Sequence, residues 1–196
     1  GVEKRGRQQP VMYVSECASP YRCFVEDIMD SCSVLVQTIS LKRFKKEDMI
    51  VHDWIVDRRK KAIYTIANLK SFYSKEKRAV HRVTQYRLPE LAEGENVVLT
   101  DDDVRSSFDV EFPNLLQGGS IRGKYLYLPV GLHSGNEKRL DAKRALIVVD
   151  LKKQRIAKTI SLDDLTENEP EDCDFYKGKL LLFCGQSGGI YEIPYK

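Results

Sequence analysis

The feature that most constrains the fold is a succession of short apolar stretches, each bounded by turns rich in Gly, Asp, Asn or Lys. Stretches of about four to eight residues are typical of β-strands, whereas helices show longer segments with a 3.6-residue period. The clearest pairs join residues 54–57 to 62–66, 145–149 to 155–160, and 179–183 to 189–193. The sequence therefore predicts an all-β chain built from antiparallel hairpins.

The turns between these stretches share a chemistry that suggests a repeat. Asp57 and Asp150 each follow an apolar run and precede basic turn residues, and Gly123 and Gly178 stand where a positive φ costs little. When Gly123 is overlaid on Gly178, 55 residues further on, an apolar run follows in both copies. This spacing is typical of a long blade in a radial β-repeat, so we expect a β-propeller or a partial propeller.

The repeat predicts one propeller-like domain over residues 1–196, with candidate blades at about 10–47, 48–110, 111–165 and 166–196. Closed propellers usually have about four to eight blades, because each sheet buries its faces only against its neighbours. We therefore expect either a small, irregular propeller or the C-terminal part of a larger one, and we favour the second. The charged segment 70–82 is expected to be a loop or a short helix.

Composition limits the classes of function. Lys and Arg number 32 against 29 Asp and Glu, so the net charge of +3 predicts no general attraction to nucleic acid or to an acidic membrane. No apolar run reaches the roughly 18 residues that a membrane-spanning helix needs. The first residue is Gly1 rather than Met, which favours a removed upstream segment and hence export.

The C-terminal tail carries a resemblance to a known family. It contains a Glu-Pro-Glu turn at 169–171, a Gly-Lys-Leu hairpin at 178–180 and a closing Ile-Tyr-Glu-Ile strand at 190–193. These motifs resemble the last blade of exported bacterial six-bladed β-propellers, and residues 53–57 with 63–66 are similar to an earlier blade of that family. The resemblance implies a propeller in the periplasm, at the cell surface or secreted, and it implies no particular activity.

An acidic cluster is the main candidate site. Glu169, Glu171, Asp172 and Asp174 lie around the start of a predicted inner strand, where a propeller presents residues to its central channel. A similarity to calcium-dependent lactonase propellers would make Glu169 or Glu171 a calcium ligand and Asp172 or Asp174 a base. The ligands that those enzymes draw from other blades have no identified counterpart here. Solvated surface acids are the alternative interpretation.

Other polar groups give weaker signals. His52 and His133 lie near predicted strand ends and could meet across one face of the ring, although structural or surface roles are the simpler interpretation. The acidic run at 101–103 could offer oxygen ligands to calcium, but a solvated turn explains it as well. The five cysteines and three histidines lack metal-site spacing. We therefore predict no metal site and no cofactor, with calcium as the one candidate.

The function predicted from these features is an exported binding or interaction scaffold whose ligand is a glycan or a protein. The alternative is a calcium-dependent lactonase-like hydrolase that uses the acidic residues at 169–174, and a third class is a structural subunit of a larger assembly. The enzyme requires bound calcium and carboxylates that converge on one axis. The scaffold requires only a groove lined by polar and aromatic loops.

Overall fold

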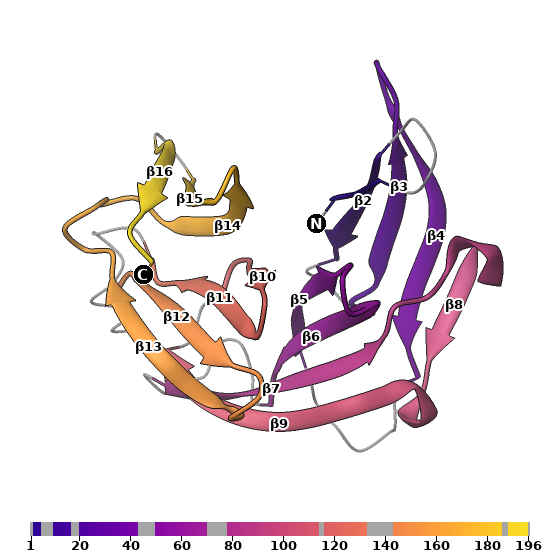
Figure 1. Ribbon diagram of the computed structural model, residues 1–196, viewed down its shortest axis with the longest axis horizontal. Coiled ribbons are helices and arrows are strands. Elements are labelled where there is room, and N and C mark those ends of the chain that lie inside the picture. The colour runs from indigo at the N-terminus through magenta and orange to yellow at the C-terminus, as the bar shows by residue number, and fades with distance from the viewer. Residues whose placement is uncertain are drawn as a thin grey trace.

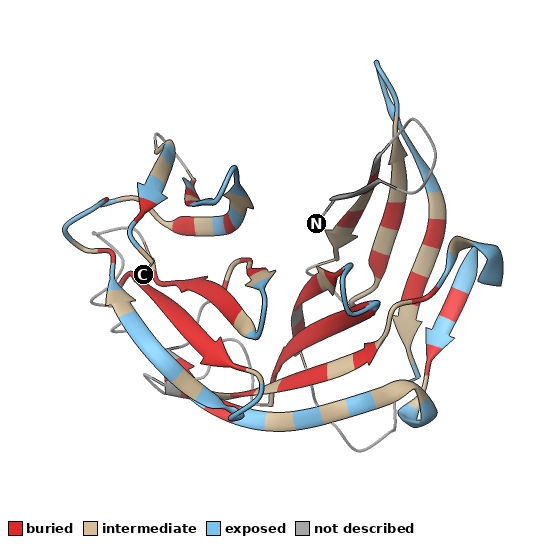
Figure 2. Cartoon of the chain, viewed as in Figure 1, coloured by how far each residue is buried: buried red, intermediate tan, exposed pale blue. Residues whose placement is uncertain are grey.

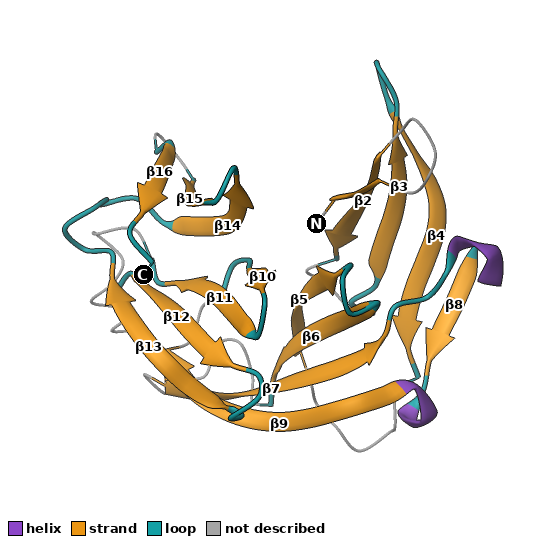
Figure 3. Cartoon of the chain, viewed as in Figure 1, coloured by secondary structure: helices purple, strands orange, loops and turns teal. Residues whose placement is uncertain are grey.

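The structure, a computed structural model, describes residues 2–4, 10–16, 20–42, 50–69, 78–113, 116–132, 143–185 and 188–195. Strands dominate this part of the chain, and its helices are two single 3-10 turns, η1 (Leu91–Glu93) and η2 (Asp101–Asp103) (Figure 3). No helix within these ranges is long and apolar enough to cross a membrane. The predicted all-β class is confirmed, because four small sheets are arranged like propeller blades (Figure 1).

The first two sheets are interleaved along the chain. The first sheet has the strand order β1-β2-β3-β4-β8, with β1 at Val2–Lys4, β2 at Pro10–Ser15, β3 at Cys23–Ile28, β4 at Ser33–Leu41 and β8 at Asn96–Leu99. The second has the order β5-β6-β7-β9, with β5 at Ile50–Asp57, β6 at Ala62–Asn68, β7 at Arg78–Arg87 and β9 at Val104–Pro113. Neighbouring strands are antiparallel except β4 and β8, which are parallel.

The last two sheets follow the chain without exchange. The third has the order β10-β11-β12-β13, with β10 at Ser120–Arg122, β11 at Tyr125–Val130, β12 at Ala145–Asp150 and β13 at Arg155–Ser161. The fourth contains β14 at Pro170–Tyr176, β15 at Lys179–Cys184 and β16 at Ile190–Ile193. Each sheet therefore presents its first strands toward the inside of the arc, where β5, β10 and β14 are neighbours.

Strand β8 ties the first sheet to the second. The chain leaves β7, adds β8 to the outer edge of the first sheet, and returns as β9 to the outer edge of the second. The side-chain amide of Gln37 on β4 donates to the carbonyl oxygens of Glu90 (3.0 Å) and Gly94 (2.9 Å) in the crossing segment. Arg87 forms an ion pair with Glu93 at 2.7 Å in the same segment. These bonds fix where the crossing chain lies between the two sheets.

The hairpin turns use the chemistry that the sequence indicates. The Asp150 carboxylate accepts hydrogen bonds from the backbone N–H groups of Lys152 and Lys153, both at 3.0 Å, and from Lys124 Nζ at 3.0 Å. Burial tends to raise the pKa of Asp150, but these bonds outweigh it and hold the pKa below its usual value. An Asp side chain that satisfies the turn N–H groups lets the chain reverse at once after a buried strand.

The repeat between the third and fourth sheets is one residue shorter than the overlay of Gly123 on Gly178 predicts. Arg122 and Tyr176 end the equivalent strands β10 and β14, and they are 54 residues apart. Gly123 is the first residue of the two-residue turn between β10 and β11. Gly178 is instead the second residue of the turn between β14 and β15, where it follows Lys177; φ is 83° at Gly178 and 46° at Lys177. The two turns therefore belong to different classes, and aligning their glycines shifts the register.

Residues 78–82 are strand rather than the predicted loop or short helix. They begin β7, which pairs with β6 on one side and β9 on the other. Ala79 and His81 are buried, and the His81 ring stacks on Phe112 with a centroid distance of 3.7 Å. Arg82 instead pairs with Asp109 at 2.9 Å. The alternation of buried and exposed side chains along this strand is hidden in the sequence because a histidine takes an inward position. Residues 70–77 lie outside the described residues.

Three apolar clusters join consecutive sheets (Figure 2). Trp54 and Ile63 pack on the first sheet, Leu128 and Phe112 belong to the cluster between the second and third sheets, and Leu182 packs on the third. All seven residues of β6 and all six of β12 are buried, because each strand is covered on both faces. The sheets are therefore held together by inter-sheet packing.

The packing predicts a difference between buried and exposed leucines. Leu128→Ala removes a fully buried side chain between the second and third sheets, and we expect the free energy of unfolding to fall by about 2–5 kcal/mol. Leu35→Ala truncates a side chain that is 54% exposed and should change it by about 0.5 kcal/mol or less. Urea unfolding of both variants measures this, and equal losses would contradict the inter-sheet core.

Candidate functional site

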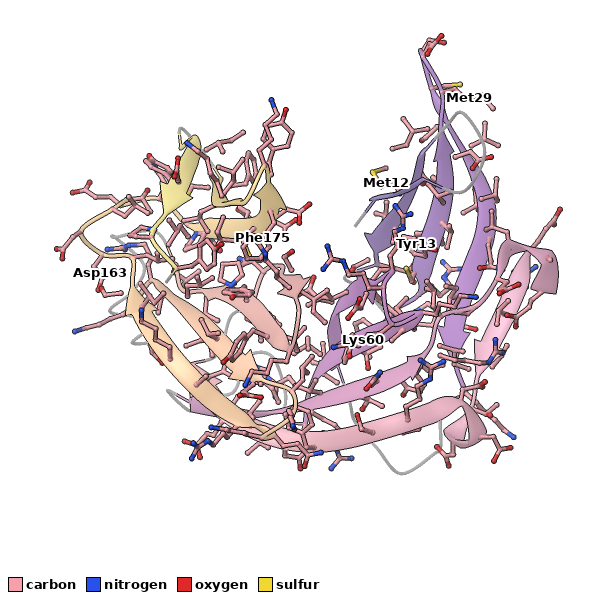
Figure 4. All side chains as sticks on the ribbon, in the orientation of Figure 1. Met12, Tyr13, Met29, Lys60, Asp163 and Phe175 are labelled. Carbon is pink, nitrogen blue, oxygen red and sulfur yellow. The ribbon has the colours of Figure 1, made fainter. Side chains whose placement is uncertain are left out.

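A pocket of about 440 Å³ lies where the inner strands of the second, third and fourth sheets meet. Its wall comes from β5, β10 and β14 and from the hairpin turns that follow them. Figure 4 labels Lys60, in the turn after β5, and Phe175, on β14. Three consecutive blades thus contribute to one concave site.

Hydrogen bonds between turns hold the wall together. Lys60 Nζ donates to the carbonyl oxygen of Gly123 at 2.7 Å, which joins the second sheet to the third. The Arg122 guanidinium donates to the carbonyl oxygen of Gly178 at 3.2 Å, which joins the third sheet to the fourth. Because these bonds link separate blades, the pocket forms only when the blades have assembled.

Arg122 is the most firmly placed cation of the pocket. Its guanidinium donates to the Tyr195 hydroxyl at 2.9 Å and lies over the Phe175 ring, 4.8 Å from the centroid. The Phe175 ring meets Tyr127 and Tyr195 edge to face, at centroid distances of 5.0 and 5.2 Å. Cation–π and edge-to-face contacts of this kind fix orientation as well as adding stability. The charge of Arg122 is therefore held at one place in the wall.

Arg58 and Arg59 supply two further cations. Both lie in the turn between β5 and β6, are exposed, and line the pocket. Across the described ranges, neither guanidinium has a hydrogen-bond or ion-pair partner. Asp57 precedes the same turn, but its carboxylate interacts with Lys60 instead. It accepts a hydrogen bond from the Lys60 backbone N–H at 3.2 Å and forms an ion pair with Lys60 Nζ at 3.4 Å. Two positive charges thus face the pocket without a counter-charge.

The carboxylates of β14 are, in contrast, engaged. Asp174 accepts a hydrogen bond from the Ser120 hydroxyl at 2.9 Å. Asp172 accepts from the backbone N–H groups of Gly119 at 3.0 Å and Cys173 at 2.7 Å. Both carboxylates line the pocket while holding the fourth sheet to the third. They combine a structural role with two acceptor sites in the wall.

Asp53 adds a buried acid beside this wall. It lies on β5, is 8% exposed, and its Oδ2 atom has no hydrogen-bond partner in the described part of the chain. Burial, together with the charge of Asp172, raises the pKa of Asp53 to about 7. Desolvation also raises the pKa of Asp172, although its two N–H bonds act in the opposite direction.

The structure divides the acidic cluster that the sequence singles out. Asp172 and Asp174 line the pocket, whereas Glu169 and Glu171 precede it. Glu169 accepts a hydrogen bond from the Gln117 amide. Glu171 occupies a bulge of β14, where burial and the charge of Glu169 raise its pKa. Two of the four acids therefore belong to the pocket lining.

The described residues do not test whether the two predicted histidines meet. The backbone of His52 lies in a bulge of β5 between Val51 and Asp53, the counterpart of the bulge at Glu171. His133 lies outside the described residues. A meeting of His52 and His133 stays a prediction.

The search for a metal site gives a limited result. Among the residues that the structure describes, no three His, Cys, Asp or Glu side chains are grouped so that they could hold a metal ion. The acidic run at 101–103 forms η2, where Asp103 binds the Arg87 guanidinium and accepts from the Thr100 backbone N–H at 2.8 Å. A calcium site at 169–174 stays a prediction that rests on the resemblance alone.

Sequence reasoning missed the three arginines of the pocket. Arg58, Arg59 and Arg122 read as ordinary solvated turn residues, because basic side chains are common in hairpin turns. A signal was nevertheless present: inner strands of a radial repeat converge on its axis, so cations placed in successive inner turns are brought near one another. From the sequence, we considered this convergence for the acids near the inner strand at 170–176 and not for the basic turns.

Comparisons with known proteins assign no family. The chain matches no protein-family model, and no curated protein is detectably similar to it. The structure itself shows four blades. A six-bladed ring and export stay predictions.

The raised pKa of Asp53 predicts a pH dependence of stability. An unfolded aspartate ionises near pH 4, whereas native Asp53 keeps its proton to about pH 7, so the native state loses stability across that interval. Asp53→Asn removes this loss, and we expect the variant to gain roughly 4 kcal/mol relative to the wild type between pH 4 and pH 8. Urea unfolding over that range measures it. The exposed Asp102→Asn serves as control, and parallel profiles for all three proteins would refute the assignment.

Proposed function

We propose that this chain is an exported β-propeller-type scaffold that binds an oligosaccharide in the pocket between its second, third and fourth blades. The observation that carries this proposal is the assembly of one concave, polar wall from three consecutive inner-strand hairpins. Small-molecule sites are typically concave, with a few placed polar groups that fix orientation. The bonds between turns keep this wall formed before a ligand arrives.

The chemistry of the wall suits a saccharide. Sugar hydroxyls both donate and accept hydrogen bonds, and the pocket offers a guanidinium donor at Arg122 and carboxylate acceptors at Asp172 and Asp174. Phe175 adds an aromatic surface against which the apolar face of a sugar ring packs.

We also propose that the four blades belong to a larger, six-bladed ring, as the resemblance of the tail implies. Blades of a propeller bury their faces against their neighbours, yet the first and fourth sheets face each other across the opening of the arc (Figure 1). Phe183 and Ile190, a register pair on the fourth sheet, are 51% and 70% exposed. Leu35 and Val98 on the first sheet are each 54% exposed. Further blades between these two sheets would cover such apolar side chains.

The proposed pocket predicts different effects of two adjacent aromatic substitutions. Phe175→Ala removes a pocket side chain and the support of Arg122, and we expect the affinity for oligosaccharides to fall by about tenfold or more, equivalent to about 1.4 kcal/mol. Tyr176→Ala truncates a side chain that is 59% exposed outside the pocket and should leave the affinity unchanged.

A glycan array with the wild-type chain would select the oligosaccharide, and calorimetric titration would compare the variants after circular dichroism has shown that both are folded. Absence of binding to every glycan, or equal losses in the two variants, would contradict the pocket as a saccharide site.

A further inference from the structure

We infer that the oligosaccharide is acidic, and that Arg58 and Arg59 bind its carboxylate or sulfate groups. This inference rests on the proposed function and names the class of its ligand. It follows from the hydrogen bonds in the pocket, where the acids have donors and two of the arginines have no acceptor among the residues that the structure describes.

The backbone that carries Arg58 and Arg59 is fixed even though their guanidinium groups are free. Lys60 Nζ holds the turn to the Gly123 carbonyl oxygen at 2.7 Å, and the Arg105 guanidinium donates to the Lys60 carbonyl oxygen at 3.0 Å. The turn is therefore attached both to the third sheet and to β9. A fixed backbone reduces the entropy lost when the two side chains order around a ligand.

Guanidinium groups match the geometry of the inferred ligand. Their planar fork donates two parallel hydrogen bonds to a carboxylate, a sulfate or a phosphate, and charge assistance strengthens each bond. Arg58 and Arg59 are adjacent and repel each other, and within the described ranges neither guanidinium has an acceptor, so a bound anion would lower the repulsion between them. A neutral sugar would offer these two guanidinium groups no charged acceptor.

The carboxylates of the same pocket do not oppose this assignment, because Asp57 is bonded to Lys60 and the two acids of β14 are also engaged. Asp174 is bonded to Ser120, and Asp172 to two backbone N–H groups. We therefore expect the anionic group at the turn after β5 and the neutral hydroxyls toward β14. This polarity gives the ligand one preferred orientation.

The test compares binding of three probes by isothermal titration to the full chain. The probes are a tetragalacturonate, which carries carboxylates, a heparin-derived tetrasaccharide, which carries sulfates, and neutral cellotetraose. The double variant Arg58→Gln/Arg59→Gln removes the inferred anion site. Its matched control, Lys152→Gln/Lys153→Gln, removes the same charge from the exposed turn after β12, which does not line the pocket.

We expect at least one acidic probe to bind, with a dissociation constant that rises about tenfold or more in Arg58→Gln/Arg59→Gln and stays within about twofold in the control. Raising sodium chloride from about 50 to 500 mM should weaken binding to the wild type more than to the arginine variant. The probe that binds more tightly distinguishes carboxylate from sulfate recognition.

Three results would overturn the inference in different ways. Equal losses in the two double variants would mean that general surface charge, not the pocket, attracts the acidic probes. Binding of cellotetraose that is unaffected by Arg58→Gln/Arg59→Gln would refute an acidic ligand while leaving the saccharide site intact. Failure of all three probes, together with a glycan array without any positive, would refute the proposed function as well.

Discussion

Burial of one sheet face against the next is the constraint on which the rest of this structure depends. Every sheet has three to five short strands, too few to bury its own apolar side chains. The three inter-sheet clusters provide that burial, and β6 and β12 are covered on both faces as a result. Because consecutive sheets pack in the same way, their inner strands are brought together around one axis. The pocket is a consequence of this arrangement.

Hydrogen bonds between segments then fix the orientation of one blade against another, which apolar packing alone does not determine. Apolar contacts between sheets are not directional, so they permit small rotations of one blade against another. Gln37, Lys60 and Arg122 each donate from one segment to a backbone carbonyl of another, and such bonds are directional. Arg122 lines the pocket, and Lys60 lies in the turn after β5 that carries Arg58 and Arg59. The same interactions that set the angle between blades therefore set the shape of the site.

The blade junction also contains charged groups that lack partners in the described part of the chain. Asp53 is buried there with an unpartnered oxygen beside Asp172, and Arg58 and Arg59, a few residues further along, have no counter-charge among the described residues. Elsewhere, charged groups such as Arg87 and Asp150 are satisfied by well-placed partners. Proteins commonly depart from full polar satisfaction where they bind ligands, which agrees with placing the site at this junction.

Local chemistry was sufficient to predict much of the fold. Alternating apolar runs and the turn residues Asp57, Asp150 and Gly178 act over a few residues, so the hairpins and the all-β class could be recognised from the sequence. Among the residues that line the pocket, Asp172 and Asp174 were singled out from the sequence, whereas the arginines were not. Strand β7 was missed at residues 78–82 because His81, a residue usually near the surface, is buried against Phe112.

Only the tertiary structure decided which distant segments meet. The parallel pairing of β8 with β4 joins segments more than 50 residues apart, and no short-range pattern encodes that partner. The convergence of Arg58, Arg59 and Arg122 likewise depends on which strand of each blade is innermost. The sequence by itself determined the hairpins, because their hydrogen bonds and turns are local. The order of strands within the sheets and the composition of the pocket were decided by the burial of whole sheets against one another, which is a property of the assembled chain.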